Sequence, residues 1–522
     1  EVGLEFEKEE RTIMIEKIHI KERSMRFFML FIFNLFWCLL SLGAFVFNKH
    51  FSVDDYWIYY DQKGASLTDV QQNMRMFSGS LYYLLDRWGV NIVEQQIFFG
   101  VILLITFAWV TTRISMEIAD AVNIQENVGK IILADGGTLI LFLNAAVSEY
   151  LYYSGVYVQW IIGIIGLTYG AICISREKRV VINWLVGTAA LIIMAGSYQT
   201  FLAQYAYVVM ALIFIRNAGK ANRKTIMANV RAIAAAAVAM GVNMIGIKML
   251  AYCGIIGEDS RMSLDLMKIP ELVGDIIRSQ KSIWFEGMGI YPKGILALLA
   301  VFFLGILLVV LCKRKAKIEE WIYLIIVLVS GSCVMYAAQI MQGFIRVTNR
   351  GMYAIFGIYA VSIWVICYYL RDADWKVIKR VNICVISIFL VYSSIQVNRI
   401  AIDVFMTNTL SRCYVEEINR RIINYENQNS IQVMKVGFCS DAFISYRYNR
   451  FIETTAYGDM CANPFLADWS SVSALNYYTG RALELVSVPD YIVEYYAEFN
   501  WDEADWDKQL VFDSDAVYIC VF

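Results

Sequence analysis

The sequence has little charge, proline or histidine. Asp, Glu, Lys and Arg make up only 18% of its 522 residues and hydrophobic residues 59%, which is not the composition of a water-soluble protein. Two histidines argue against a histidine-based metal centre, and four prolines leave no proline-rich linker. No P-loop, GxGxxG, HExxH, GxSxG or CxxC pattern occurs in a fitting context. We therefore expect a membrane protein without a nucleotide energy source or a nucleic-acid partner.

Long apolar runs fill most of the chain. Eleven segments approach the roughly 20 residues that a helix needs to cross about 30 Å of hydrocarbon. They lie at 26–47, 92–112, 128–147, 155–174, 180–196, 200–215, 226–252, 292–312, 318–340, 352–370 and 377–397. The fifth and sixth are short and are separated only by Ser197, Tyr198 and Gln199. The sequence predicts a polytopic α-helical membrane protein with about eleven spans.

Basic residues mark every second connection between these spans. They precede the first span and recur at Arg113, Lys130, 176–179, 216–224, 313–317 and 371–380. Short cytoplasmic loops collect Lys and Arg, so we expect the N-terminus inside and the chain after the last span outside. The predicted units are an amphipathic cytoplasmic or interfacial segment at 1–25, a transmembrane domain at 26–398 with outer-face loops at 48–91 and 253–291, and an extracytoplasmic domain at 399–522.

The region 399–522 has the composition of a small globular domain. A helical pattern at 414–425 and strand-like runs at 431–438, 483–488 and 516–522 predict a compact α/β fold. Up to two disulfides can form in an oxidising setting among its four cysteines, Cys413, Cys439, Cys461 and Cys520.

Two adjacent carboxylates, Asp54 and Asp55, follow the outer end of the first span in the segment Phe51-Ser-Val-Asp-Asp-Tyr-Trp57. Neighbouring like charges can raise one pKa and so favour proton abstraction, or they can share a divalent cation such as Mg²⁺ or Mn²⁺, with Asp55 as a ligand. The alternative is a helix N-terminus in which Ser52 and the two acids act as caps. The sequence leaves both interpretations open.

Further polar residues are expected at the same outer level. Glu149, Gln159, Tyr198 and Gln199 are candidates for binding the hydroxyls of a sugar or an acceptor. The alternatives are a solvated loop acid for Glu149 and helix–helix hydrogen bonds for the neutral groups.

Four cations are candidates for binding a phosphate. Arg346 and Arg350 lie four residues apart on the side where short loops are poor in positive charge, so one helical turn presents both guanidiniums together. Arg75, in an amphipathic stretch at 64–87, and Lys281, in the longest outer loop, are further candidates. The alternative for these cations is contact with the headgroups of membrane lipids.

The order of these features resembles the C-type (GT-C) superfamily of membrane glycosyltransferases. Within it, Phe51-Ser-Val-Asp-Asp-Tyr56 and Gly196-Ser-Tyr-Gln-Thr200 are similar to the Gtr family of O-antigen glucosyltransferases. That family has a Gly-Arg-aromatic element where this chain reads Phe77-Ser-Gly-Ser-Leu81, which leaves Arg75 as a substitute for the missing arginine.

The resemblance implies an inverting hexosyltransferase in the bacterial plasma membrane. It would move a sugar, glucosyl or a related hexose, from a polyprenyl-phosphate carrier to a surface glycan or a lipid-linked acceptor. Asp54 would be the base, Asp55 would assist or bind a cation, and Arg346 and Arg350 would hold the phosphate. The competing classes are a flippase or exporter of lipid-linked oligosaccharide and a polymerase of surface polysaccharide.

Overall fold

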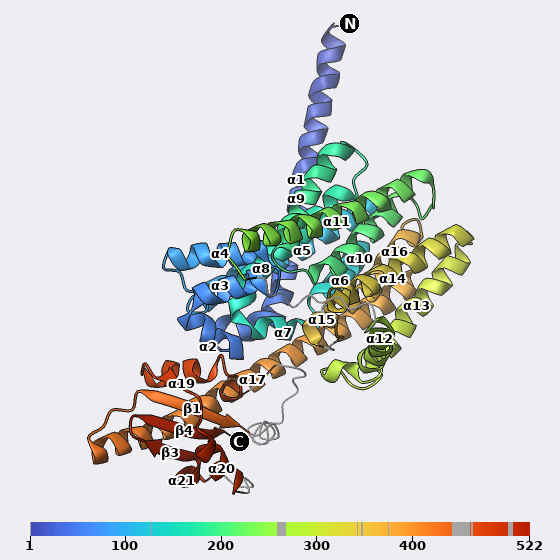
Figure 1. The fold of residues 1–522 in the computed structure, drawn as a ribbon. Coiled ribbons are helices and arrows are strands. Elements are labelled where there is room, and N and C mark those ends of the chain that lie inside the picture. Colours follow the sequence, from blue (N-terminus) through green and yellow to red (C-terminus); the bar gives the residue numbers. More distant parts are fainter. Residues whose placement is uncertain are drawn as a thin grey trace.

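The computed structural model describes residues 2–125, 127–257, 268–341, 343–345, 348–373, 375–440, 460, 463–499 and 505–521. A mostly helical body is joined by one long helix to a small domain with a mixed sheet (Figure 1). The fold class expected from the sequence is confirmed.

Within the described residues, eight helices are long and apolar enough to cross a membrane. They are built on α1 (Val2–Phe47), α5 (Gln96–Val122), α8 (Tyr157–Ile174), α11 (Arg223–Tyr252), α13 (Ile295–Lys313), α14 (Ile318–Met341), α16 (Gly357–Tyr369) and α17 (Lys376–Asn429). The other three predicted spans fall on the shorter helices α6 (Val128–Phe142), α9 (Val180–Ala195) and α10 (Phe201–Arg216). The helix α1 continues unbroken through residue 25, so the segment predicted at 1–25 is not separated from the first span by a break in the backbone.

Small residues allow the membrane helices to approach one another closely. In α8, a Cβ on Gly166 would lie 2.7 Å from the carbonyl oxygen of Ala190 in α9. Trp364 of α16 packs against Gly137 of α6 and donates its indole N–H to the carbonyl oxygen of Ala134 at 3.0 Å. Close packing of this kind stabilises helix pairs where lipid removes most of the hydrophobic driving force.

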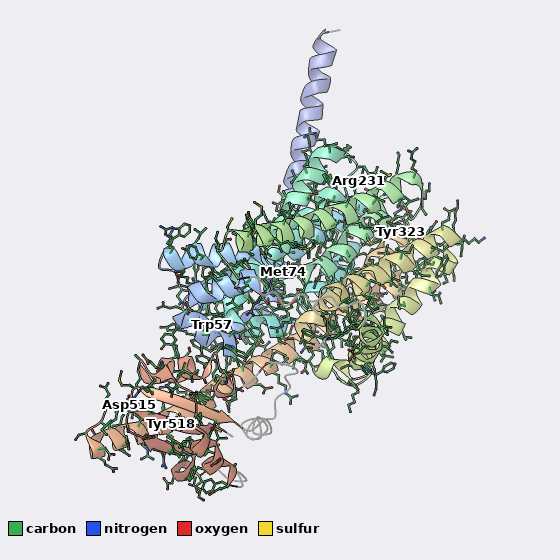
Figure 2. The ribbon with its side chains drawn as sticks, viewed as in Figure 1. Trp57, Met74, Arg231, Tyr323, Asp515 and Tyr518 are labelled. Atoms are coloured by element: carbon green, nitrogen blue, oxygen red, sulfur yellow. The ribbon has the colours of Figure 1, made fainter. Side chains whose placement is uncertain are left out.

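One end of the body carries short helices rather than spans. They are α2 (Val53–Tyr60), α3 (Gln62–Gln71), α4 (Met76–Arg87), α7 (Val147–Tyr152), η1 (Ser154–Val156), α15 (Asn349–Met352) and η4 (Tyr353–Phe356). The amphipathic stretch expected at 64–87 is two helices, because the chain bends at Met74, where φ is 54° (Figure 2). Two side chains fasten this bend to the body. Gln199 donates to the carbonyl oxygens of Asn73 and Met74 at 3.0 and 2.8 Å, and Asn243 donates to that of Met74 at 2.5 Å.

Basic residues of the opposite end, which the sequence places in the inside loops, gather on one face. Glu117 is buried in α5 and forms ion pairs with Arg113 of the same helix, with Arg176 between α8 and α9, and with Arg216 at the end of α10. Lys130 donates to the carbonyl oxygen of Arg371 at 2.7 Å. Basic residues from separate parts of the chain thus lie together at this end of the body.

The helix α17 passes without a break from the membrane body into the C-terminal domain, so the boundary predicted at 398 falls inside a helix. Its last turns cover a four-stranded sheet in the order β2 (Glu484–Leu485), β1 (Lys435–Ser440), β4 (Ala516–Val521), β3 (Leu510–Asp513). β1 is parallel to β2 and β4, whereas β3 is antiparallel to β4. Every residue of β4 is buried, which makes it the central strand of this core. The helices α19 (Ser471–Thr479), α20 (Asp490–Ala497) and α21 (Trp506–Gln509) complete the domain.

The cysteines of this domain differ in their surroundings. Cys439 and Cys520 are register partners on β1 and β4. Cys413 is exposed on α17, and no disulfide joins any two of Cys413, Cys439 and Cys520. Cys461 lies outside the described residues.

Aromatic side chains dock this domain onto α2. The ring of Phe51 lies 4.5 Å from that of Tyr477 in α19, and the hydroxyls of Tyr56 and Tyr478 are 2.7 Å apart. Asn408 of α17 exchanges two hydrogen bonds with the backbone of Phe51, at 2.8 and 2.9 Å. Trp57 lies on the side of the body next to the C-terminal domain (Figure 2). The segment that begins α2 is thus held from both sides.

We expect Gly166→Ala to lower the free energy of unfolding by about 1–3 kcal/mol, because the added methyl group meets backbone that cannot rotate away. Gly241→Ala in α11, where a Cβ meets nothing within 4 Å, is the control and should leave stability unchanged or higher. Thermal unfolding of the detergent-solubilised protein measures both. Equal effects of the two changes would contradict the α8–α9 contact.

Candidate active site

A cavity of about 290 Å³ opens at the end of the body that carries the short helices. It is lined by residues of α2, of the bend after α3, of α7, of α14 and of α15. Five residues singled out from the sequence line it together: Asp54, Arg75, Tyr198, Gln199 and Arg350. They come from four separate parts of the chain, so the fold creates this site.

Asp55 does not line this cavity, although it is the neighbour of Asp54 in sequence. Ser52 and Asp55 form a capping box at the start of α2, as the capping interpretation expects. The buried carboxylate of Asp55 accepts hydrogen bonds from three backbone N–H groups, those of Ser52 at 2.8 Å, Ser154 at 3.2 Å and Gly155 at 2.8 Å. Burial raises the pKa of Asp55 to about 6, against the opposing effect of these donors. Asp55 therefore joins α2 to η1.

The same hydrogen bonds determine whether Asp55 is available to bind the divalent cation considered from the sequence. Both carboxylate oxygens of Asp55 already accept backbone N–H groups, so they do not fit a cation shared with Asp54. Among the described residues, no group of three or more His, Cys, Asp and Glu side chains is arranged to hold a metal ion. No step is assigned to a metal here.

Asp54 lines the cavity and contacts the C-terminal domain. Trp469, just before α19, donates its indole N–H to Oδ1 of Asp54 at 3.1 Å. The side chain of Trp469 is itself exposed. A residue more than 400 positions away in the sequence thus contacts the carboxylate that lines the cavity.

Arg75 is held by a buried network beneath the cavity. Its guanidinium donates to Asp69 and to Gln159, both at 3.1 Å, and lies 4.3 Å over the ring of Tyr198. Asp69 also accepts from Ser78 at 2.8 Å and from Gln159 at 2.9 Å. Burial acts to lower the pKa of Arg75, but the charge of Asp69 and the Tyr198 ring leave the pKa raised. This arginine is positively charged and fixed in orientation.

Arg350 has an equivalent arrangement on the other side. Its Nε lies 3.4 Å from Oε1 of Glu149, and its backbone N–H donates to Oε2 at 2.7 Å. The guanidinium lies 4.7 Å over the ring of Tyr153. Tyr150 donates to the carbonyl oxygen of Arg350 at 2.7 Å, and Glu149 is fully buried. Each cavity arginine is therefore paired with a buried carboxylate and covered by a tyrosine ring.

Gln199 lines the cavity and also supports it, whereas the remaining candidates from the sequence do not line it. Gln159 and Glu149 hold the two arginines rather than line the cavity, and the amide nitrogen of Gln199 holds the bend that carries Arg75. Lys281, at the end of α12 (Ile269–Trp284), is exposed and pairs with Glu286 at 3.7 Å, outside this cavity. Arg346 lies outside the described residues.

Two residues of the site were missed from the sequence. Asp69 sits six positions before Arg75, a spacing that hints at an ion pair only once the bend between α3 and α4 is known. Trp469 has no sequence signal, since its contact with Asp54 depends on how the C-terminal domain docks.

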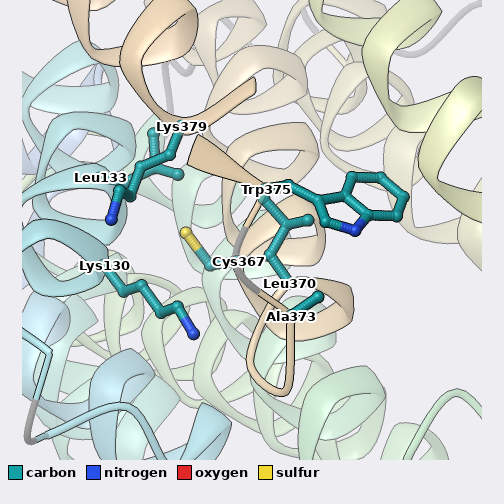
Figure 3. A pocket seen from close by; sticks show the side chains of 7 residues that line it. All are labelled: Lys130, Leu133, Cys367, Leu370, Ala373, Trp375 and Lys379. Carbon is teal, nitrogen blue, oxygen red and sulfur yellow. The ribbon is translucent and has the colours of Figure 1, made fainter. Parts of the chain in front are cut away.

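A second, much smaller pocket lies among the basic residues of the opposite end (Figure 3). Lys130, Lys379 and Trp375 are among its lining residues, and its volume is about 10 Å³. That volume holds about one water molecule. It is too small for a substrate.

Comparison with known families gives one match. The family model described as Glucosyl transferase GtrII matches residues 43–367, more than half of the chain. The chain belongs to this family. It is therefore a multi-pass membrane glucosyltransferase, and the matched region contains Asp54, Arg75 and Arg350. No curated protein and no solved structure matches the chain. Trp469 lies beyond the part of this glucosyltransferase that the family model covers.

The two adjacent acids should differ in stability tests. We expect Asp55→Ala to lower the free energy of unfolding by about 1–3 kcal/mol or more, because it leaves three buried N–H groups without an acceptor. Asp54→Ala, which alters the cavity wall, should change stability by less than about 1 kcal/mol. Thermal unfolding of the two purified variants compares them directly. A larger loss for Asp54→Ala would contradict the assignment of Asp55 as the cap.

Proposed function

We propose that this glucosyltransferase moves a glucosyl group from a polyprenyl-phosphate carrier to a hydroxyl of a surface glycan or lipid-linked acceptor. The observation that carries the proposal is one cavity lined by a carboxylate and two fixed guanidiniums, Asp54, Arg75 and Arg350. A carboxylate suits the removal of a hydroxyl proton, and guanidiniums suit a phosphate. Membership of the glucosyltransferase family supports the reaction type.

We assign the cavity and the C-terminal domain to the outer side of the plasma membrane. The supporting observation is the basic face at the other end of the body, which includes Arg113, Arg176, Arg216 and Lys130. Short loops that remain in the cytoplasm collect such residues. A donor carried by a membrane lipid can reach this side without a cytoplasmic nucleotide.

The proposed reaction is a single displacement. The acceptor oxygen attacks the anomeric carbon from the side opposite the phosphate, a bond forms between them, and the bond from that carbon to the phosphate oxygen breaks. Polyprenyl phosphate leaves with the electron pair, the acceptor proton passes to Asp54, and the configuration at the anomeric carbon is inverted. Arg75 and Arg350 stabilise the negative charge that develops on the leaving phosphate.

The supporting side chains have separate roles in this scheme. Asp69, Gln159 and Glu149 are positioning residues, because they fix the two guanidiniums before the donor binds. Tyr198 and Gln199 line the cavity wall and are assigned to the sugar. The indole N–H of Trp469 orients the carboxylate of Asp54. The acceptor would enter beside the C-terminal domain.

Asp54→Asn should reduce glucosyl transfer by at least about 100-fold, the usual contribution of a general base. The assay uses proteoliposomes with a defined polyprenyl-phosphate glucose and an isolated acceptor glycan. Binding of the donor and thermal stability should remain close to wild type. Full transfer by the variant would contradict the proposed role of Asp54. In cells, the variant should leave the glycan unmodified but exposed at the surface, whereas glycan trapped inside would indicate an exporter.

Arg75→Lys and Arg350→Lys keep the positive charge but lose the planar contacts with Asp69, Glu149 and the tyrosine rings. We expect each to lower kcat/KM for the donor about 10- to 100-fold, as the loss of a charge-assisted hydrogen bond would. Lys281→Ala is the matched control, since Lys281 lies outside the cavity, and it should transfer normally. A defect in Lys281→Ala equal to those of the two arginine variants would place the phosphate elsewhere.

A further inference from the structure

An apolar groove of about 430 Å³ is lined by residues of α10, α11 and α14. Figure 1 shows where these three helices lie in the membrane body. The helix α10 packs closely against α14 and contributes buried residues, including Tyr205, Ala206 and Val209, so it forms the floor of the groove. The walls come from α11 and α14, whose lining residues include the exposed Ala237 and Ile326. No residue proposed above to take part in the reaction lies in this groove.

The few polar groups along the groove bond to the protein. Tyr205 donates its hydroxyl to the carbonyl oxygen of Ala232 at 3.1 Å, and Ser330 donates to that of Val327 at 2.8 Å. Asn229 donates to the hydroxyl of Tyr323 at 2.9 Å. The surface left for an occupant is therefore hydrocarbon, which binds an apolar chain and offers little to a sugar.

The two ends of the groove differ. At one end the Asn229–Tyr323 hydrogen bond joins α11 to α14 and closes it. At the other end, residues that line the groove are near in sequence to residues that line the active-site cavity. On α14, Val334 lines the groove and the next residue, Met335, lines the cavity. At the start of α10, Thr200 lines the cavity and Leu202 lines the groove. The apolar groove thus leads away from the cavity that holds the two arginines.

We infer that this groove holds the polyprenyl chain of the donor, an inference that rests on the proposed function. The donor joins a phosphate to a long hydrocarbon chain. The protein offers matching surfaces in the same order, two arginines followed by an apolar groove. From Asn229 to Met240 the α11 wall rises about 17 Å, at 1.5 Å per residue, so it lines several isoprene units. Burial of hydrocarbon in this groove would add to the affinity that the phosphate supplies.

Two neighbouring residues of α11 allow a matched test. Ala237 and Val238 are both exposed, but only Ala237 lines the groove. Ala237→Trp should fill the groove, and Val238→Trp adds the same ring elsewhere on the helix. The assay measures kcat/KM for a long-chain polyprenyl-phosphate glucose and for a two-isoprene analogue. We expect the long-to-short ratio to fall about tenfold in Ala237→Trp and to stay at the wild-type value in Val238→Trp.

The outcomes separate this inference from the proposed function. Wild-type protein that transfers from neither donor contradicts the proposed function itself. Wild-type protein that transfers from both donors, with an unchanged ratio in Ala237→Trp, overturns the groove alone. An equal loss in both variants also overturns it, because a general disturbance of α11 would then explain the result.

Photolabelling tests the groove in the unmodified protein, so it does not depend on the variants folding. A polyprenyl phosphate with a diazirine in its chain is irradiated with the full-length enzyme in vesicles of neutral phospholipid, and the labelled peptides are mapped. We expect label on α10, α11 and α14, reduced by competition with unlabelled polyprenyl phosphate. Equal labelling of these helices by a diazirine phospholipid, without competition, would identify the occupant as bulk lipid and reject the inference.

Discussion

The pairing of each cavity arginine with a buried carboxylate is the interaction on which the site depends. An unpaired charge in a water-poor interior costs several kcal/mol, so Arg75 and Arg350 require Asp69 and Glu149 as partners. These partners also fix direction, because a guanidinium that donates to a carboxylate and lies over a tyrosine ring has few alternative rotamers. The short helices at this end of the body bring the two residues of each pair together. The bend at Met74 brings Arg75 over Asp69, and α15 brings Arg350 over Glu149 of α7.

The same pairing of arginines with carboxylates affects which anions the cavity binds. Asp69 and Glu149 balance the two arginines, and Asp54 adds a third carboxylate, so the site has no net positive charge and free anions gain little by entering it. A phosphate attached to a hydrocarbon chain gains hydrogen bonds from fixed donors and the burial of its chain as well. On the proposed function, the joint presence of cavity and groove would favour a lipid phosphate over an inorganic one. Preorganised donors also need little rearrangement as charge develops on the leaving oxygen.

Sequence patterns predicted the long helices well because hydropathy is a local property. Eight of the eleven predicted spans fall on helices long and apolar enough to cross a membrane, and the other three fall on shorter helices. Sequence patterns also singled out Asp54, Arg75 and Arg350, which line one cavity. They could not distinguish the role of Asp54 from that of Asp55. Asp55 is a structural residue because it accepts hydrogen bonds from the N–H groups of Ser154 and Gly155, about 100 positions away. They could not distinguish Lys281 from the cavity arginines either, since both kinds of cation were expected in outer loops. The short strand β3 and the Trp469 contact were missed because each depends on tertiary packing.

The continuity of α17 links the membrane body to the domain that completes the site. A helix that runs unbroken from Lys376 to Asn429 transmits orientation better than a flexible linker, and Asn408 clamps it to the backbone of Phe51. The aromatic contacts of Phe51 and Tyr56 with α19 bring the C-terminal domain to the residues that precede and follow Asp54. Trp469 reaches Asp54 because the domain docks in this way. Any movement of the domain that accompanies acceptor binding would therefore alter the hydrogen bond between Trp469 and the carboxylate of Asp54. The long helix and the aromatic contacts thus hold Trp469, which lies outside the family match, against Asp54.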